Sequence, residues 1–306
     1  MSAGTTTTES GENLAHAAPA FETARLLPHL ASLQEGYGSA YERYAVGKLM
    51  ETMATRLQAR TIAEWPANGV LGVPGLKSLP LAFAGCDVTL LNPSRALLDG
   101  AARIWQAARA PAPRLVVGDP EGSDVAEASS FDLVWSFCAF EHAKAPDRLA
   151  REMVRVARGH VLVFVQNAWM PGVHLHRLHH RLGGQSWDHG SLGSMRGESV
   201  AERLHEAGAH IVELGGCDLP PWPDLDVRLP RFGRSAAALE GAPRPYGPGD
   251  AVLPASAAAR VFERPARLNP PMRFLAKWHD HVESKIPRGI LRWVAHHPYV
   301  LARKTG

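Results

Sequence analysis

Short apolar runs alternate with helix-like segments over most of the chain, and this alternation limits its possible folds more than any other feature. The runs are rich in apolar and β-branched residues, and the segments between them carry apolar residues at helical spacing. This order predicts an α/β protein with a doubly wound, mostly parallel sheet of seven strands. The expected strands are RTIAEW, DVTLLN, RLVVGD, FDLVWSFCAF, HVLVFVQN, the end of SVAERLHEAGAHIVELGG, and PYVLARK, the last as an antiparallel edge strand.

We expect the chain to divide into four parts. Residues 1–20 are small and polar, which predicts a disordered tail and excludes a secretory signal. Residues 21–217 contain the strand and helix alternation and form the expected core domain. Residues 218–290 are rich in proline and predict an insertion that completes a pocket, with a helix near residues 255–263. Residues 291–306 return to the core as its closing strand.

Charge and cysteine content exclude several classes of protein. The net charge is +3 over 306 residues, with no long basic run, so no nucleic-acid partner is expected. The three cysteines, Cys86, Cys138 and Cys217, are far apart and form neither a zinc-type pair nor a disulfide framework, which favours a reducing cytoplasm. No run of apolar residues is long enough to span a membrane. The oligomeric state is not indicated by the sequence.

Polar residues fall where the first three expected strands end. Glu64 ends the first strand, Asn92 the second, and Asp119 follows the third. A loop from Pro66 to Gly75 follows the first strand. In doubly wound sheets, ligands bind outside the carboxyl ends of the strands, where the strand order reverses. These positions are therefore the candidates for cofactor binding.

The succession of motifs resembles that of the class I S-adenosylmethionine-dependent methyltransferases of the type 11 group. The resemblance spans about residues 40–215 and is carried by AEWPANGVLGVPGLKSLPLA, VTLLNPS, LVVGDP, SFDLVWSFCAFEH and LAREMVRVARGHVLVFVQN. It implies a Rossmann-like methyltransferase fold, S-adenosylmethionine as cofactor, and an enzyme that transfers a methyl group.

The resemblance also implies roles for individual residues. Glu64 matches the acid of the first motif, and Gly75 with Ser78 matches the last glycine and the small residue that opens the helix. The loop between them is longer than is usual in the family, and Pro66 and Asn68 occupy glycine positions. The implied cofactor-binding set is Glu64, Pro66, Gly72, Gly75, Asn92, Asp119 and Phe137, with Ser136 and Cys138 lining the amino-acid end of the cofactor.

Two of these positions carry specific expectations. Asn92 stands where the family has a ribose-binding acid, and its amide can still accept from and donate to hydroxyls. Asp119 matches the acid that contacts the adenine amine. As alternatives, Glu64 is a solvated strand end or a capping acid, and Asp119 simply starts a turn.

Three residues are the candidate catalytic groups. His142 follows the fourth strand near the expected methyl position, and Asp188 with His189 forms a pair that can orient a proton acceptor. They favour an oxygen atom as the methyl target, on a small-molecule, sugar or lipid-linked acceptor. The alternatives are a loop cap for Asp188 and His189 and a structural contact for His142.

The segment after the fifth strand predicts an amphipathic lid helix. Leu175, Leu178 and Leu182 share one side, whereas the other side is basic, with Arg177 and Arg181. The basic side can meet an anionic acceptor or a membrane surface as a peripheral contact, or it is simply solvated. His176 and His180 have the spacing of zinc ligands, but no acid or cysteine lies between them, so no metal site is predicted.

Two other functions remain as alternatives. The irregular first loop and Asn92 also fit a methyltransferase-like domain that binds or scaffolds without catalysis. A nicotinamide-dependent oxidoreductase is less favoured, because no Gly-x-Gly-x-x-Gly motif follows the first strand.

Overall fold

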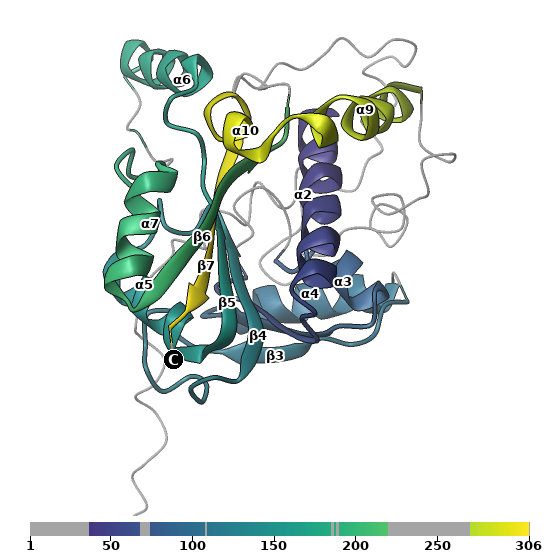
Figure 1. The fold of residues 1–306 in the computed structure, drawn as a ribbon, viewed down its shortest axis with the longest axis vertical. Coiled ribbons are helices and arrows are strands. Elements are labelled where there is room, and N and C mark those ends of the chain that lie inside the picture. Colours follow the sequence, from purple (N-terminus) through teal and green to yellow (C-terminus); the bar gives the residue numbers. More distant parts are fainter. Residues whose placement is uncertain are drawn as a thin grey trace, which may run out of the picture.

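A computed structural model describes residues 37–67, 74–107, 109–184, 187, 190–219 and 270–305. These residues form one seven-stranded sheet with the strand order β3-β2-β1-β4-β5-β7-β6 (Figure 1). The strands are β1 (Thr61–Glu64), β2 (Asp87–Asn92), β3 (Arg114–Val117), β4 (Phe131–Phe137), β5 (Ala157–Phe164), β6 (Ala209–Cys217) and β7 (His297–Lys304). The predicted α/β fold with a mostly parallel sheet is confirmed.

Strand β7 was correctly predicted to be antiparallel, but its predicted position at the edge of the sheet is wrong. It pairs with β5 on one side and with β6 on the other, antiparallel to both. Six of its eight residues are buried, which suits a strand with two neighbours. The edges are instead β3 and β6. The last strand in the sequence therefore completes the sheet from within.

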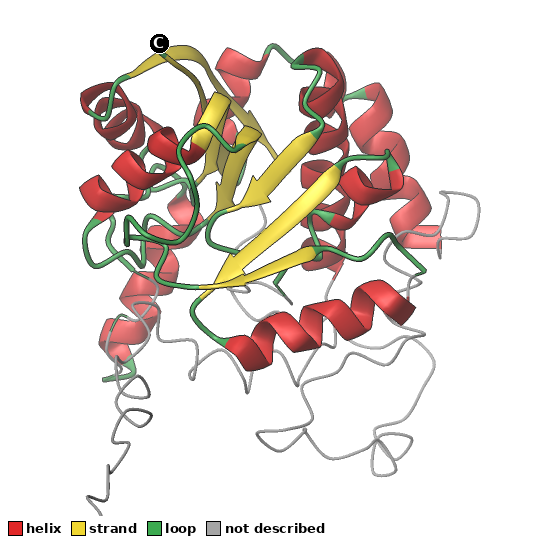
Figure 2. Cartoon of the chain, turned by 90° about the horizontal axis from the view of Figure 1, so that it is seen from below, coloured by secondary structure: helices red, strands yellow, loops and turns green. Residues whose placement is uncertain are grey.

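Helices cover both faces of the sheet (Figure 2). Apolar residues of α2, α3 and α4 pack into one core cluster, and those of α5 and α7 into another. The helices are α2 (Tyr37–Arg56), α3 (Leu79–Phe83), α4 (Arg95–Ala107), α5 (Pro146–Val156), α6 (Pro171–Leu182), α7 (Gly197–Glu206), α9 (Pro270–His281) and α10 (Arg288–Val294), with a short 3-10 helix η3 (Glu283–Lys285).

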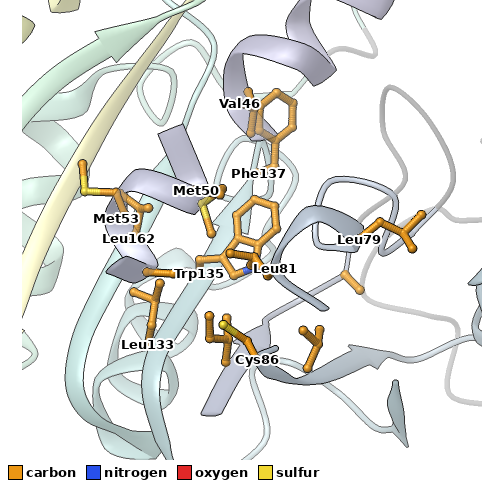
Figure 3. Packing of buried hydrophobic residues seen from close by; sticks show 14 of the residues in the cluster. Val46, Met50, Met53, Leu79, Leu81, Cys86, Leu133, Trp135, Phe137 and Leu162 are labelled. Carbon is orange, nitrogen blue, oxygen red and sulfur yellow. The ribbon is translucent and has the colours of Figure 1, made fainter. Parts of the chain in front are cut away.

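Strand β4 shows how the apolar sequence fills both clusters. Leu133, Trp135 and Phe137 point to the side of α2 and α3, as Figure 3 shows, whereas Val134 belongs to the other cluster. Successive strand residues face opposite sides of a sheet, so a strand covered on both sides needs a nearly continuous apolar run. This is why the runs in this sequence were recognisable as central strands.

Helix α3 carries a proline in its first turn, the part of a helix where proline is tolerated. The helix begins at Leu79 and carries Pro80 in that turn, where the missing N–H would have no partner inside the helix. The four residues from Leu79 to Ala82 are all buried. The helix is therefore a short packed element directly behind the first loop.

The division into four parts stays a prediction. The tail and the helix expected near residues 255–263 lie outside the described residues. At the end of the expected insertion, α9 packs against α2 through Leu275, and Trp278 Nε1 donates to the carbonyl of Leu219 at 2.6 Å. Phe274 is 66% exposed and does not share in this packing.

Among the described helices, none combines the length and the apolar character needed to cross a lipid bilayer.

The close packing of β6 on α10 predicts that Gly216→Ala destabilises the protein. A Cβ at Gly216 would lie 2.4 Å from the carbonyl oxygen of Leu291, which is backbone and cannot move aside cheaply. We expect the free energy of unfolding to fall by roughly 1–3 kcal/mol in urea denaturation. Gly289→Ala is the matched control, because nothing lies within 4 Å of its added Cβ. An equal stability of the two variants would contradict this packing.

Candidate functional site

The candidate site lies at the carboxyl edge of the parallel strands, where the chain order of the sheet reverses between β1 and β4. In Figure 1, this edge is at the top, and α6, α9 and α10 lie above it. The turn after β1, the ends of β2 and β3 and the loop after β4 all meet there. The residues predicted from the ends of the first four strands are thus brought to one edge.

Glu64 is buried at the end of β1 and holds the following turn. Its Oε2 accepts a hydrogen bond from Ser78 Oγ at 2.6 Å, and its Oε1 accepts one from the N–H of Gly75 at 3.4 Å. Ser78 Oγ also accepts a bond from Trp135 Nε1 at 3.2 Å. The carboxyl group therefore ties the first turn to the neighbouring strand β4, and a solvated strand end is excluded for it.

Gly75 is required by its conformation and by its neighbours. Its φ of +77° is strained for other residues, and an added Cβ would lie 2.5 Å from Leu90 Cδ1. Its carbonyl accepts a bond from Trp105 Nε1 at 3.2 Å. Gly72, together with the rest of residues 68–73, lies outside the described residues. Pro66 is buried and follows a cis peptide bond from Trp65.

Burial raises the pKa of Glu64 to about 7, although the Ser78 hydrogen bond, the Lys77 charge and the Gly75 N–H oppose the rise. A carboxylate in an apolar setting favours its neutral form until donors or cations compensate. The group therefore titrates close to neutral pH in the folded protein.

Asn92 uses both ends of its amide to hold the backbone. Its Nδ2 donates to the carbonyl of Ala67 at 2.8 Å, and its Oδ1 accepts from the N–H of Ser94 at 2.7 Å. Only 2% of the residue is exposed. A carboxylate cannot donate, so an acid here would place two acceptors against each other. The loop thus gives a structural reason for the amide at this position.

Asp119 is exposed and starts a turn, as its alternative reading expected. Its Oδ1 accepts from the N–H of Glu121 at 2.9 Å, while no described residue bonds to its Oδ2. Asp119 Oδ2 therefore receives no hydrogen bond from the described residues. Glu121 is buried, and its Oε1 accepts from the N–H groups of Lys144 and Ala145, immediately before α5.

Phe137 lies beside a buried group of charged side chains. Its ring contacts that of His297 at a centroid distance of 4.7 Å, and Lys77 Nζ lies 3.9 Å from the ring centroid. Lys77 also pairs with Glu42 Oε1 at 2.9 Å. Phe137 and Lys77 therefore lie in contact with a second polar cluster, which includes Glu42 and His297.

His142 is partly exposed in the turn after β4. The neighbouring Glu141 is buried, and burial raises its pKa to about 7 against the bond from the N–H of Gln166. Asp188 and His189 lie outside the described residues. However, Ser191 N–H donates to the carbonyl of Glu141 at 2.8 Å, so the chain that follows them reaches the His142 turn.

Comparison with protein families tests the resemblance that the sequence motifs indicated. The family described as "Methyltransferase domain", the type 11 group, matches residues 71–165. This segment runs from the first loop through α3, β2, α4, β3, β4, α5 and β5. Residues 71–165 are thus similar to a methyltransferase domain. The resemblance inferred from the sequence motifs is thereby confirmed.

Several solved protein structures are similar to this chain. The [4+2]-cyclase SpnF has 16% identity and a TM-score of 0.44, with 84% of this chain and 80% of that chain covered. Magnesium protoporphyrin IX methyltransferase from Synechocystis, solved with bound SAH, has 14% identity and a TM-score of 0.40, with 55% and 75% covered. The Bacillus subtilis YcgJ protein has 11% identity and a TM-score of 0.44, with 85% and 98% covered. No curated protein matches the sequence.

Several residues of this edge were missed by sequence reasoning. Glu42 and His297 belong to segments far apart in the chain, so no spacing pattern links them. Glu141 stands next to the predicted His142, and its position in the FEH motif was the signal that could have found it. Glu121 lies in a loop, where no sequence pattern singled it out.

The donor role of Asn92 predicts that Asn92→Asp destabilises the protein by about 2 kcal/mol, because a buried acceptor then faces the Ala67 carbonyl. Thermal or urea unfolding measures this loss. Asp119→Asn is the matched control: it keeps the acceptor for Glu121 at an exposed site and should change stability by less than about 0.5 kcal/mol. A stable Asn92→Asp variant would show that the amide is not a required donor.

The raised pKa of Glu64 predicts a pH-dependent contribution to stability. The unfolded carboxyl titrates near 4.5 and the folded one near 7, so the neutral form stabilises the fold below pH 4.5. As the pH rises through 7, the wild-type protein should lose roughly 3 kcal/mol relative to Glu64→Gln. Urea unfolding at pH values from 4.5 to 8 measures the difference. Glu51→Gln, at an exposed helix position, should keep the wild-type profile; a parallel Glu64→Gln profile would contradict the assignment.

Proposed function

We propose that the protein is an S-adenosylmethionine-dependent methyltransferase that acts in the cytoplasm. The observation that carries the proposal is the hydrogen-bonded turn of Glu64, Gly75 and Ser78 at the point where strand order reverses; Gly75 and Ser78 fall inside the segment that matches the methyltransferase domain. The three cysteines are buried and form no disulfide, in keeping with a reducing compartment.

The residues at the strand ends fit such a cofactor in most positions. Gly75 lets the backbone approach a ligand closely, and Glu64 keeps the turn in place. Asp119 offers its open Oδ2 to an amine such as that of adenine. The amide of Asn92 already serves the backbone, so we assign it mainly to holding the loop, with any ribose contact shared through its remaining hydrogen-bonding capacity.

The bound cofactor supplies an electrophilic methyl group, and the protein must orient the acceptor in line with it and exclude water. His142 lies after β4 at the same edge of the sheet as the proposed cofactor site and is our candidate for accepting a proton from a hydroxyl acceptor. Asp188 and His189 are the other candidates. Both lie outside the described residues, and Ser191, which follows them in the sequence, bonds to the carbonyl of Glu141 in the His142 turn. Oxygen therefore remains our proposed target atom.

A small-molecule or lipid-linked acceptor is supported by the surface of α6. Leu175, Leu178 and Leu182 are 56%, 49% and 79% exposed on this helix, which follows β5 above the same sheet edge. Trp169, just before the helix, is 53% exposed. An exposed apolar stripe of this kind suits a hydrophobic acceptor or peripheral contact with a membrane.

The alternative of a methyltransferase-like module without catalysis rested on the irregular first loop and Asn92. Asn92 has a structural explanation in its bond to Ala67, and the Glu64 turn has its hydrogen bonds in place. Neither feature now argues for a lost site.

Isothermal titration with S-adenosylmethionine and S-adenosylhomocysteine tests the proposal. We expect binding to the wild-type protein, and a loss of at least about tenfold in affinity for Asp119→Ala, since one hydrogen bond to a charged group is worth about 1.5–3 kcal/mol. Asp124→Ala removes an exposed acid of the same loop and should bind like the wild type. A folded wild-type protein that binds neither compound would overturn the enzyme assignment.

A further inference from the structure

Three buried side chains converge behind Phe137, outside the proposed cofactor site. Asp218 follows the end of β6, and His296 and His297 stand at the start of β7. Asp218 and His297 are fully buried, and His296 is 8% exposed. The antiparallel pairing of Cys217 with His297 brings these two chain segments together. The cluster therefore follows from the placement of β7 inside the sheet.

The distances among these groups fit ligands of one shared metal ion. His296 Nδ1 lies 3.6 Å from Asp218 Oδ2, and His297 Nε2 lies 3.7 Å from the same oxygen. Both distances exceed the usual range of an N–H···O hydrogen bond, about 2.7–3.2 Å. Ligand atoms about 2.0–2.1 Å from one tetrahedral ion lie roughly 3.4 Å apart. All three ligand atoms lie within 4.8 Å of one another.

Asp218 has no hydrogen bond to compensate for its burial. Neither of its carboxylate oxygens has a hydrogen-bond partner among the described residues. A buried carboxylate of this kind is costly unless it is paired or coordinates a metal.

The surrounding residues orient Asp218 toward the histidines. Glu283 accepts hydrogen bonds from the backbone N–H groups of Asp218 and Leu219, both at 2.8 Å. It also accepts one from the hydroxyl of Tyr41. The backbone on either side of the carboxylate is thus fixed. Outer contacts that hold ligand-bearing segments are typical of metal sites.

Each histidine has one ring nitrogen facing Asp218 Oδ2. The two rings are stacked, with centroids 4.5 Å apart and an interplanar angle of 7°, so one ring must turn for both nitrogens to meet the same ion. Glu42 Oε2 lies 3.2 Å from His297 Nε2 and offers a further oxygen, although its other oxygen pairs with Lys77.

We propose that Asp218, His296 and His297 form a binding site for a divalent transition-metal ion of the zinc or ferrous-iron type. Two imidazoles and one carboxylate suit these ions and leave coordination positions open. The proposal does not depend on methyl transfer or on cofactor binding. It places an ion at the same edge of the sheet, beside Phe137, whose ring contacts His297, and near Lys77, which pairs with Glu42.

Zinc titration of the full-length protein, after treatment with a chelator, tests the proposal. We expect one equivalent of Zn²⁺ to bind to the wild type, with an affinity at least about 100-fold weaker in Asp218→Asn and in His296→Gln. Co²⁺ should give a tetrahedral visible absorption spectrum that both substitutions abolish. Neither readout requires S-adenosylmethionine or an acceptor, so failure here is distinct from failure of the proposed function.

His279→Gln is the matched control, because His279 is also buried and faces an acid, Asp280 Oδ1, at 3.3 Å, but lies outside the three-residue cluster. It should bind zinc like the wild type. Circular dichroism establishes that each variant is folded before titration. His296→Gln, at the rim of the cluster, keeps the test decisive if Asp218→Asn does not fold. Absence of a stoichiometric zinc site in the wild type, or equal binding in a folded ligand variant, would overturn the proposal and leave a plain buried His–Asp pair.

Discussion

The buried carboxyl group of Glu64 is the contact on which the candidate site depends. It joins the end of β1 to the N–H of Gly75 and the hydroxyl of Ser78, and Ser78 in turn meets the indole of Trp135 on β4. The acid therefore links the two strands between which the chain order reverses. Because the group is desolvated, these few hydrogen bonds carry more weight than they would at a solvated turn. They fix the turn at the carboxyl end of β1, where sheets of this type bind their ligands.

Asn92 shows how a departure from a family pattern can be structural. Its donor end bonds to the carbonyl of Ala67, which follows β1, a role that an acid cannot fill. This hydrogen bond links the end of β2 to the turn after β1, so the amide has a structural role at this position.

The carboxyl edge of the sheet holds two polar groups. One surrounds Glu64, and the other joins Glu42, Asp218, His296 and His297; Lys77 pairs with Glu42 of the second group, and its charge also acts on Glu64. Both are possible because β7 enters the sheet between β5 and β6 and brings its first residues to the carboxyl edge. The same insertion buries Tyr299 and Val300 in the core. The closing strand therefore contributes to the site as well as to stability.

The α/β class, the succession of strands, the resemblance to a methyltransferase domain and the positions of Glu64, Asn92 and Asp119 at strand ends could all be read from the amino-acid sequence. Local patterns suffice for these, because apolar periodicity and strand-end residues are neighbours in the chain. The folded arrangement was needed to show that β7 lies inside the sheet, that the Asn92 amide bonds to the backbone of Ala67, and that Asp218 faces His296 and His297. Each of these depends on pairing between segments distant in sequence, and strand pairing across such distances leaves no periodic mark on either segment.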